Sequence, residues 1–107
     1  MSADKIRALN DAFRSTFGGG RMLITRGVQE RGETFVRKAL AAVKAFDAFT
    51  PENDPHGEHD FGSLTVQGTK LYFKIDYYDA LERFGSEDPA DPAKTTRVLT
   101  ILLPEEY

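Results

Sequence analysis

Residues 58–79 read EHDFGSLTVQGTKLYFKIDYYD, and this stretch decides the fold. Within it, residues 70–78 alternate between apolar side chains and side chains that are charged or carry a hydroxyl group. An alternation of this period predicts a β-strand with one buried face, because successive strand residues point to opposite sides of a sheet. The predicted core face carries Leu71, Phe73, Ile75 and Tyr77.

The preceding residues predict the partner strand of a β-hairpin. A two-residue turn at Gln67 and Gly68 would bring the apolar faces of both strands together. This register pairs Val66 with Thr69, Leu64 with Leu71 and Gly62 with Phe73. Gln-Gly is a weaker turn signal than Asn-Gly, so a longer loop with a slipped register remains open.

The same register predicts an aromatic and charged outer face. Carried further, it pairs Phe61 with Lys74 and Ser63 with Tyr72, and it places His59 opposite Asp76. Exposed tyrosines on a sheet are typical of protein contacts. The predicted protein-binding residues are therefore Phe61, Tyr72, Lys74, Asp76 and Tyr78 on the face, with Asp54, Glu58 and His59 at its rim.

Length and composition restrict the class of protein. A chain of 107 residues is expected to form a single domain, residues 1–107, with one sizeable core. It contains no cysteine, which excludes disulfide bonds and thiolate metal sites. No apolar run approaches the length of a membrane span, and residues 1–10 lack the apolar segment of a signal peptide. We therefore expect a cytoplasmic protein with no membrane partner.

The net charge of −3 conceals an asymmetry along the chain. Residues 1–46 hold nine Lys or Arg against four Asp or Glu, whereas residues 47–107 hold five against thirteen. Attraction between the two halves would explain this pattern, and so would a charged partner.

The remaining elements complete a small α+β domain. Apolar spacing predicts helices over Ala3–Phe17 and Gly32–Phe46, with Gly18, Gly19 and Gly20 ending the first. Met22–Ile24 is expected to be a strand covered on both faces, and Arg97–Leu103 a central strand. The predicted fold is a two-layer sandwich in which one mainly antiparallel sheet of about four strands has two helices packed on one face, leaving the other face open.

One polar segment combines residue types that can bind metals or transfer protons. It contains His56, Glu58, His59 and Asp60. The two histidines are candidate metal ligands, but their spacing matches neither the zinc-protease nor the EF-hand pattern. His59 oriented by Asp76 could act as a general acid or base, and a purely structural polar loop is the third interpretation. No serine shows a nucleophile pattern and no cysteine is present, which argues against covalent catalysis. We therefore assign no catalytic residue, and we expect no cofactor.

Several runs resemble a known family. They are IRALNDAFR (6–14), ITRGV (24–28), KAFDAFTPENDPHGEHDFG (44–62), FKIDYYD (73–79) and RVLTILLPEEY (97–107). Together they resemble an alphaproteobacterial family of unknown function, DUF3768, whose members are commonly carried on plasmids and other mobile elements. The resemblance implies a bacterial cytoplasmic protein and assigns no activity, cofactor or site.

Three functional hypotheses follow. The first is a protein-binding module that engages a partner through the open face and its acidic loops, in its sharpest form an inhibitor or regulator of a basic, nucleic-acid-handling host complex. A second copy of the chain could also cover that face. The second hypothesis is a metal-dependent enzyme or ligand binder that uses His56, Glu58, His59 and Asp76. The third is nucleic-acid binding by Arg7, Arg14, Arg21, Arg37, Lys38 and Lys44.

Overall fold

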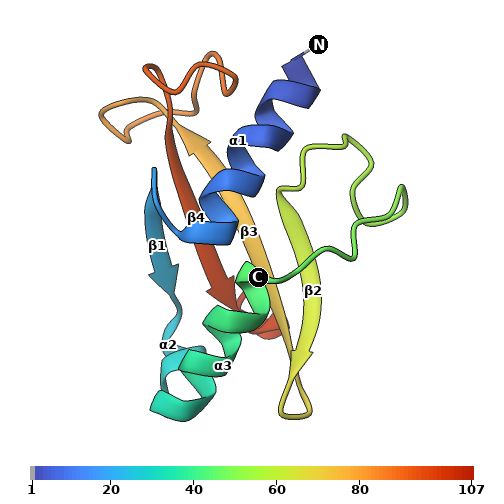
Figure 1. The fold of residues 1–107 in the computed structure, drawn as a ribbon. Coiled ribbons are helices and arrows are strands. Elements are labelled where there is room, and N and C mark those ends of the chain that lie inside the picture. Colours follow the sequence, from blue (N-terminus) through green and yellow to red (C-terminus); the bar gives the residue numbers. More distant parts are fainter. Residues whose placement is uncertain (1) are drawn as a thin grey trace.

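The computed structural model describes residues 2–107 and consists of one four-stranded sheet with helices on one side (Figure 1). Its elements are α1 (Ser2–Thr16), β1 (Arg21–Ile24), α2 (Arg26–Gln29), α3 (Glu33–Lys44), β2 (Phe61–Val66), β3 (Thr69–Tyr78), β4 (Thr96–Leu102) and the 3-10 helix η1 (Pro104–Glu106). The strand order in the sheet is β1-β4-β3-β2. No helix within the described residues combines the length and apolar character that a membrane crossing needs.

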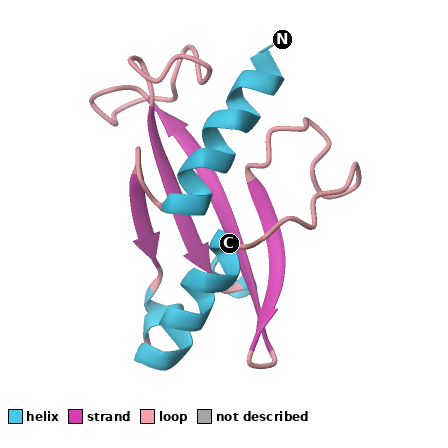
Figure 2. Ribbon diagram, viewed as in Figure 1, coloured by secondary structure: helices cyan, strands magenta, loops and turns pink. Residues whose placement is uncertain are grey.

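The predicted α+β class is confirmed. β2 pairs with β3 and β3 with β4 in antiparallel fashion, whereas β1 and β4 form one parallel pair. Helices α1 and α3 lie across the same side of the sheet, and two long loops, one joining α3 to β2 and one joining β3 to β4, lie at one end of the sheet (Figure 2). The sequence did not predict α2, because four residues are too few to display a helical period.

The β2–β3 hairpin has the predicted register. Val66 pairs with Thr69, Leu64 with Leu71 and Gly62 with Phe73. Both turn residues have positive φ angles, 49° at Gln67 and 80° at Gly68. Positive φ at both central residues is the geometry of a type I′ turn, whose twist matches that of the two strands.

The core lies between the helices and the inner face of the sheet. It is built from Phe13 of α1, Phe35, Ala39 and Val43 of α3, and Leu71, Phe73, Ile75, Leu99 and Ile101 of β3 and β4. β4 is central and almost wholly buried, as predicted. The prediction for β1 was wrong, because β1 is an edge strand and Leu23 on its outer side is 45% exposed.

Two long connections flank the beginning of α1. They are residues 45–60 and residues 79–95, and Figure 1 shows both at the end of the sheet where α1 starts. Arg7 of α1 donates to the carbonyl oxygen of Gly57 at 2.9 Å, which fastens the first connection to the helix. These connections carry most of the acidic residues of the second half of the chain.

Candidate functional site

The sheet face opposite the helices, here called the open face, is the first candidate site. Tyr72, Lys74, Asp76 and Tyr78 alternate with the buried residues of β3 and are each partly exposed. The strand register sets Phe61 of β2 opposite Lys74, as predicted. These five predicted face residues therefore share one surface.

A shallow hollow of about 330 Å³ occupies the open face over β1, β3 and β4. Its floor includes Val98 and Thr100, which are 4% and 9% exposed. Lys74 Nζ lies 2.7 Å from Asp76 Oδ2, and this hydrogen bond raises the pKa of Lys74. Because Lys74 and Asp76 neutralise each other, the hollow presents balanced charges over a floor of mixed polarity.

The opposite end of the open face is covered by the chain's own C-terminal segment. The ring of Tyr107 lies edge-on to Phe61 and Tyr72, with ring centroids 6.1 and 6.0 Å apart. Phe61 and Tyr72 also contact each other at 5.0 Å. Because Tyr107 covers part of both rings, the accessible portion of the open face is the end with Lys74, Asp76 and Tyr78.

The predicted cross-strand pair of His59 and Asp76 is wrong. β2 begins only at Phe61, and His59 adopts a positive φ of 56°, which turns its side chain to the helix side of the sheet. There its ring stacks on Phe49 at 3.8 Å, and its Nδ1 lies 2.8 Å from Asp11 Oδ1. His59 and Asp76 therefore lie on opposite faces and cannot act as a general acid–base pair.

Asp54 and Glu58 also do not lie at the rim of the open face, where they were predicted. Asp54 is 8% exposed, and its carboxylate accepts a hydrogen bond from the backbone N–H of His59 at 3.2 Å. Glu58 accepts a 2.7 Å hydrogen bond from the hydroxyl group of Tyr77, on the core side of β3. Asp54 thus stabilises the conformation of residues 45–60 from within, whereas Glu58 joins this segment to β3.

A buried polar network surrounds Tyr77. Asn10 of α1, which is fully buried, donates to the Tyr77 hydroxyl at 2.8 Å and to the carbonyl oxygen of Glu58 at 3.0 Å. Arg97 Nε donates to Asn10 Oδ1 at 2.7 Å. Burial and the hydrogen bond to Glu58 raise the pKa of Tyr77 far above its ordinary range, so its hydroxyl stays protonated. The network joins α1, residues 45–60, β3 and β4, and its role is structural.

The sequence contains one signal for this network, although Asn10 was not among the predicted residues. Asn10 stands in the apolar stripe of α1 between Ile6 and Phe13, where a polar side chain must find partners when it is buried. The partners themselves are 48 to 87 residues away, and helical spacing cannot locate them.

The metal hypothesis gains no support from the arrangement. His56 is exposed, and the side chains of Glu58, His59 and Asp76 bind separate partners. Across residues 2–107, no three His, Asp or Glu side chains converge on a position that could hold a metal ion. The structure thus separates the residues of the second hypothesis.

The six basic residues of the third hypothesis do not form one patch. Arg14 is 6% exposed, and its guanidinium lies over the ring of Phe49. Its Nε and Nη1 are the buried side-chain polar atoms without a hydrogen-bond partner in residues 2–107, and burial lowers its pKa. Arg21 is on the open face, where it pairs with Glu82, whereas Lys44 lies over Phe17 on the helix side. Nucleic-acid binding by these residues lacks the convergence it requires.

Two exposed apolar side chains were not among the predicted site residues. Leu81 is 69% exposed and Phe84 is 71% exposed, both in the turn that follows β3. The turn adjoins the open face, because Glu82 lies between them and pairs with Arg21 of β1. Two large apolar residues in an acidic turn are the sequence signal that could have identified them.

Comparison with known families gives one match. Residues 24–106 match the family model described as "Protein of unknown function (DUF3768)". The chain belongs to the DUF3768 family. The matched residues include α2, α3, the strands β2, β3 and β4, and the turn with Leu81 and Phe84, whereas α1 and all of β1 except Ile24 lie outside the DUF3768 match. No curated protein and no solved structure matches this DUF3768 chain.

Proposed function

We propose that the chain is a protein-binding module whose contact surface joins the turn 79–84 to the accessible end of the open face. The observation that carries this proposal is the exposure of Leu81 and Phe84 on a turn of defined conformation. The backbone N–H of Asp79 donates a hydrogen bond to the carbonyl oxygen of Phe84 at 2.8 Å. The backbone N–H of Glu82 donates one to the carbonyl oxygen of Asp79 at 2.9 Å. Exposed apolar side chains on a preorganised turn bind a partner with little loss of conformational entropy.

Charge supports a basic partner for this surface. Residues 79–95 contain five Asp or Glu against one Arg and one Lys. The alternative explanation, attraction between the two halves of the chain, has few direct contacts in its support. Within residues 2–107, one ion pair between Lys or Arg and Asp or Glu joins the halves, that of Arg21 with Glu82. The other four carboxylates of residues 79–95 form no ion pair within residues 2–107, and they are available to attract a positively charged surface.

The sharpest version of the proposal is a regulator of a nucleic-acid-handling complex. In that role the carboxylates of residues 79–95 occupy a basic groove that otherwise receives phosphate groups. This version rests on charge, and it also predicts that capture of the partner weakens with added salt.

Affinity capture with surface variants tests the proposal. Tagged wild-type protein, the double variant Leu81→Ser/Phe84→Ser and the single variant Tyr107→Ser are used to capture partners from a bacterial lysate at low and high salt. Removing two central apolar anchors should weaken binding by about tenfold or more. Tyr107→Ser removes another exposed ring, 76% exposed at the far end of the open face, and should leave capture unchanged.

A supporting result is a salt-sensitive partner that Tyr107→Ser retains and the double variant loses, while both variants keep the wild-type circular dichroism spectrum. Equal capture by the wild type and the folded double variant would overturn the proposal. So would the absence of any protein with that pattern.

A further inference from the structure

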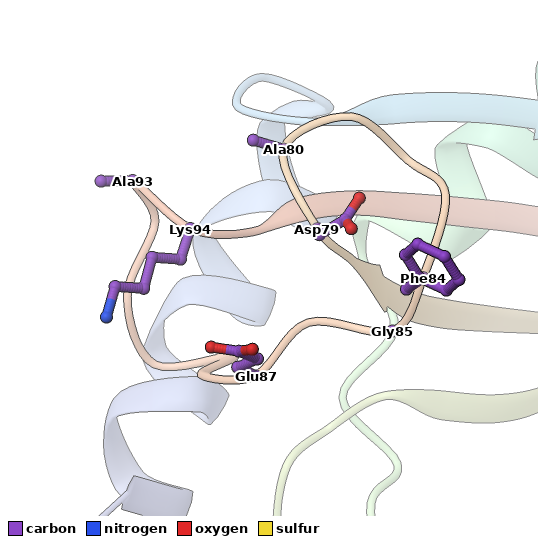
Figure 3. Close-up of a pocket in the computed structure, with 7 residues that line it drawn as sticks. All are labelled: Asp79, Ala80, Phe84, Gly85, Glu87, Ala93 and Lys94. Atoms are coloured by element: carbon purple, nitrogen blue, oxygen red, sulfur yellow. The ribbon is translucent and has the colours of Figure 1, made fainter.

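A second hollow, of about 520 Å³, lies within the connection between β3 and β4. It is bordered by the turn 79–85 on one side and by residues 87–94 on the other (Figure 3). It is separate from the hollow on the open face, since the two share no lining residue. A space of this size accommodates a side chain of a partner together with part of its neighbour.

Hydrogen bonds hold both borders of the hollow in place. Tyr78 forms a β-bridge with Gly85, and the N–H of Ser86 donates to the carbonyl oxygen of Tyr77 at 3.0 Å. The hydroxyl group of Ser86 lies 2.7 Å from that of Thr95, which joins the two borders near their base. The hollow is therefore preorganised for a ligand.

The lining combines an aromatic wall with carboxylates. Phe84, Ala80 and Ala93 supply the apolar part. Asp79 and Glu87 supply two carboxylates, of which Asp79 also accepts a hydrogen bond from the N–H of Arg83 at 3.0 Å. Glu87 is exposed, and its side chain forms no ion pair or hydrogen bond with any of residues 2–107, so it is available for a cation.

We infer that this hollow binds an arginine side chain presented by an extended segment of the partner protein. A guanidinium group in the hollow can donate two hydrogen bonds to the Glu87 carboxylate, and the exposed ring of Phe84 on the other border adds a surface that favours a cation. The apolar wall then receives the aliphatic stem or a neighbouring aliphatic residue. The inference rests on the proposed protein-binding function and adds the chemistry of the residue that is recognised.

Lys94 gives the inference a second and opposite test. It also lines the hollow, and its ammonium group repels an incoming guanidinium. Loss of the Glu87 charge and loss of the Lys94 charge should therefore change arginine binding in opposite directions.

The probe is the capped tripeptide acetyl-Leu-Arg-Leu-amide, titrated to millimolar concentration into ¹⁵N-labelled full-length protein at low salt. We expect saturable shifts of backbone amide signals that concentrate at Phe84, Gly85, Glu87 and Lys94. Acetyl-Leu-Gln-Leu-amide, which has the same apolar residues without the charge, should bind about fivefold more weakly or worse, because it forms no ion pair. The same titration is repeated with Glu87→Gln, Lys94→Gln and the control Glu52→Gln.

Glu87→Gln should weaken the arginine peptide about fivefold, and Lys94→Gln should strengthen it about twofold. Glu52→Gln removes an exposed carboxylate of the other connection and should change nothing. Equal binding of the arginine and glutamine peptides, shifts centred outside the hollow, or an unchanged affinity in Glu87→Gln would overturn the inference. If Glu87→Gln still captures the partner and Leu81→Ser/Phe84→Ser does not, the arginine site is contradicted. The proposed protein-binding function is then still supported.

Discussion

Gly62 is a residue at which the hairpin has no room for a side chain. It lies on the core face of β2 opposite Phe73, whose ring is fully buried. A Cβ atom built on Gly62 would lie 2.2 Å from Cε2 of Phe73 and 2.9 Å from Cε2 of Phe46. Those rings also contact each other, with centroids 5.2 Å apart, so neither can move away freely.

Gly62→Ala should therefore destabilise the protein by about 1–3 kcal/mol, the usual cost of overpacking a core. Gly85→Ala is the matched control, because the nearest atom to its added Cβ is 3.9 Å away. The control should be neutral or stabilising by up to about 1 kcal/mol through a less flexible unfolded chain. Urea unfolding measures both, and equal stabilities for the two variants would contradict the close approach at Gly62.

Residues of the candidate site were predictable where strand alternation governs them. Alternation placed Tyr72, Lys74 and Asp76 correctly on the open face, because each follows the pleat of β3. It failed at His59, where a positive φ ends the pleat and the ring gains contacts with Phe49 and Asp11. Those contacts span sequence separations that local periodicity does not encode.

At the scale of elements, the turn of the β2–β3 hairpin sets the register on which the open face depends. Gln67 has a φ of 49°, although residues with side chains adopt this region at a cost. Asparagine tolerates positive φ better and is favoured at this position of a type I′ turn, whereas β-branched residues are strongly disfavoured. The wild-type turn is thus correct in geometry and suboptimal in sequence.

Gln67→Asn should raise the free energy of unfolding by about 0.5–1 kcal/mol, and Gln67→Val should lower it by about 1–2 kcal/mol. Residue 67 is exposed, so neither change alters a packed side chain. Thermal and urea unfolding of the two variants provide the measurement. Effects of the same sign would mean that the turn is not of type I′.

Elements were predictable to the extent that their signals are local. The hairpin, α1, α3 and β4 follow from short periodic runs and turn residues. The parallel pairing of β1 with β4 was not predictable, since Arg21 and Val98 are far apart in sequence and no short-range pattern relates them. Because that pairing makes β1 an edge strand, the exposure of Leu23 could not be anticipated either.

At the scale of the whole molecule, hydrogen bonds join the C-terminal segment to the first half of the chain. The carboxylate of Glu106 accepts hydrogen bonds from the hydroxyl of Thr25 at 2.6 Å, the N–H of Leu103 at 2.8 Å and the N–H of Gly27 at 2.9 Å. The hydrogen bond from Thr25, followed by that from Leu103, lowers the pKa of Glu106. One carboxylate thereby joins η1 to the start of α2.

This lowered pKa makes part of the stability depend on pH. A carboxyl group whose pKa is lower in the folded state than in the unfolded state binds fewer protons when the protein is folded. Such a group stabilises the folded state at pH values above its ordinary pKa. This contribution to stability disappears as the pH falls through the pKa of the folded state. Glu106→Gln should therefore be less stable than the wild type at neutral pH. The difference should shrink as the pH is lowered through and below about 4.5, the ordinary value for glutamate.

Urea unfolding at a series of pH values from neutral to acidic measures this difference. Glu105→Gln is the control, because Glu105 is an exposed neighbour whose side chain forms no hydrogen bond within residues 2–107, and its difference from the wild type should stay near zero throughout. A Glu106→Gln deficit that is constant with pH would show that the contacts of this side chain, and not its charge, fasten the C-terminal segment. A deficit that grows on acidification would contradict the lowered pKa, since protonation of wild-type Glu106 must bring the two proteins closer together.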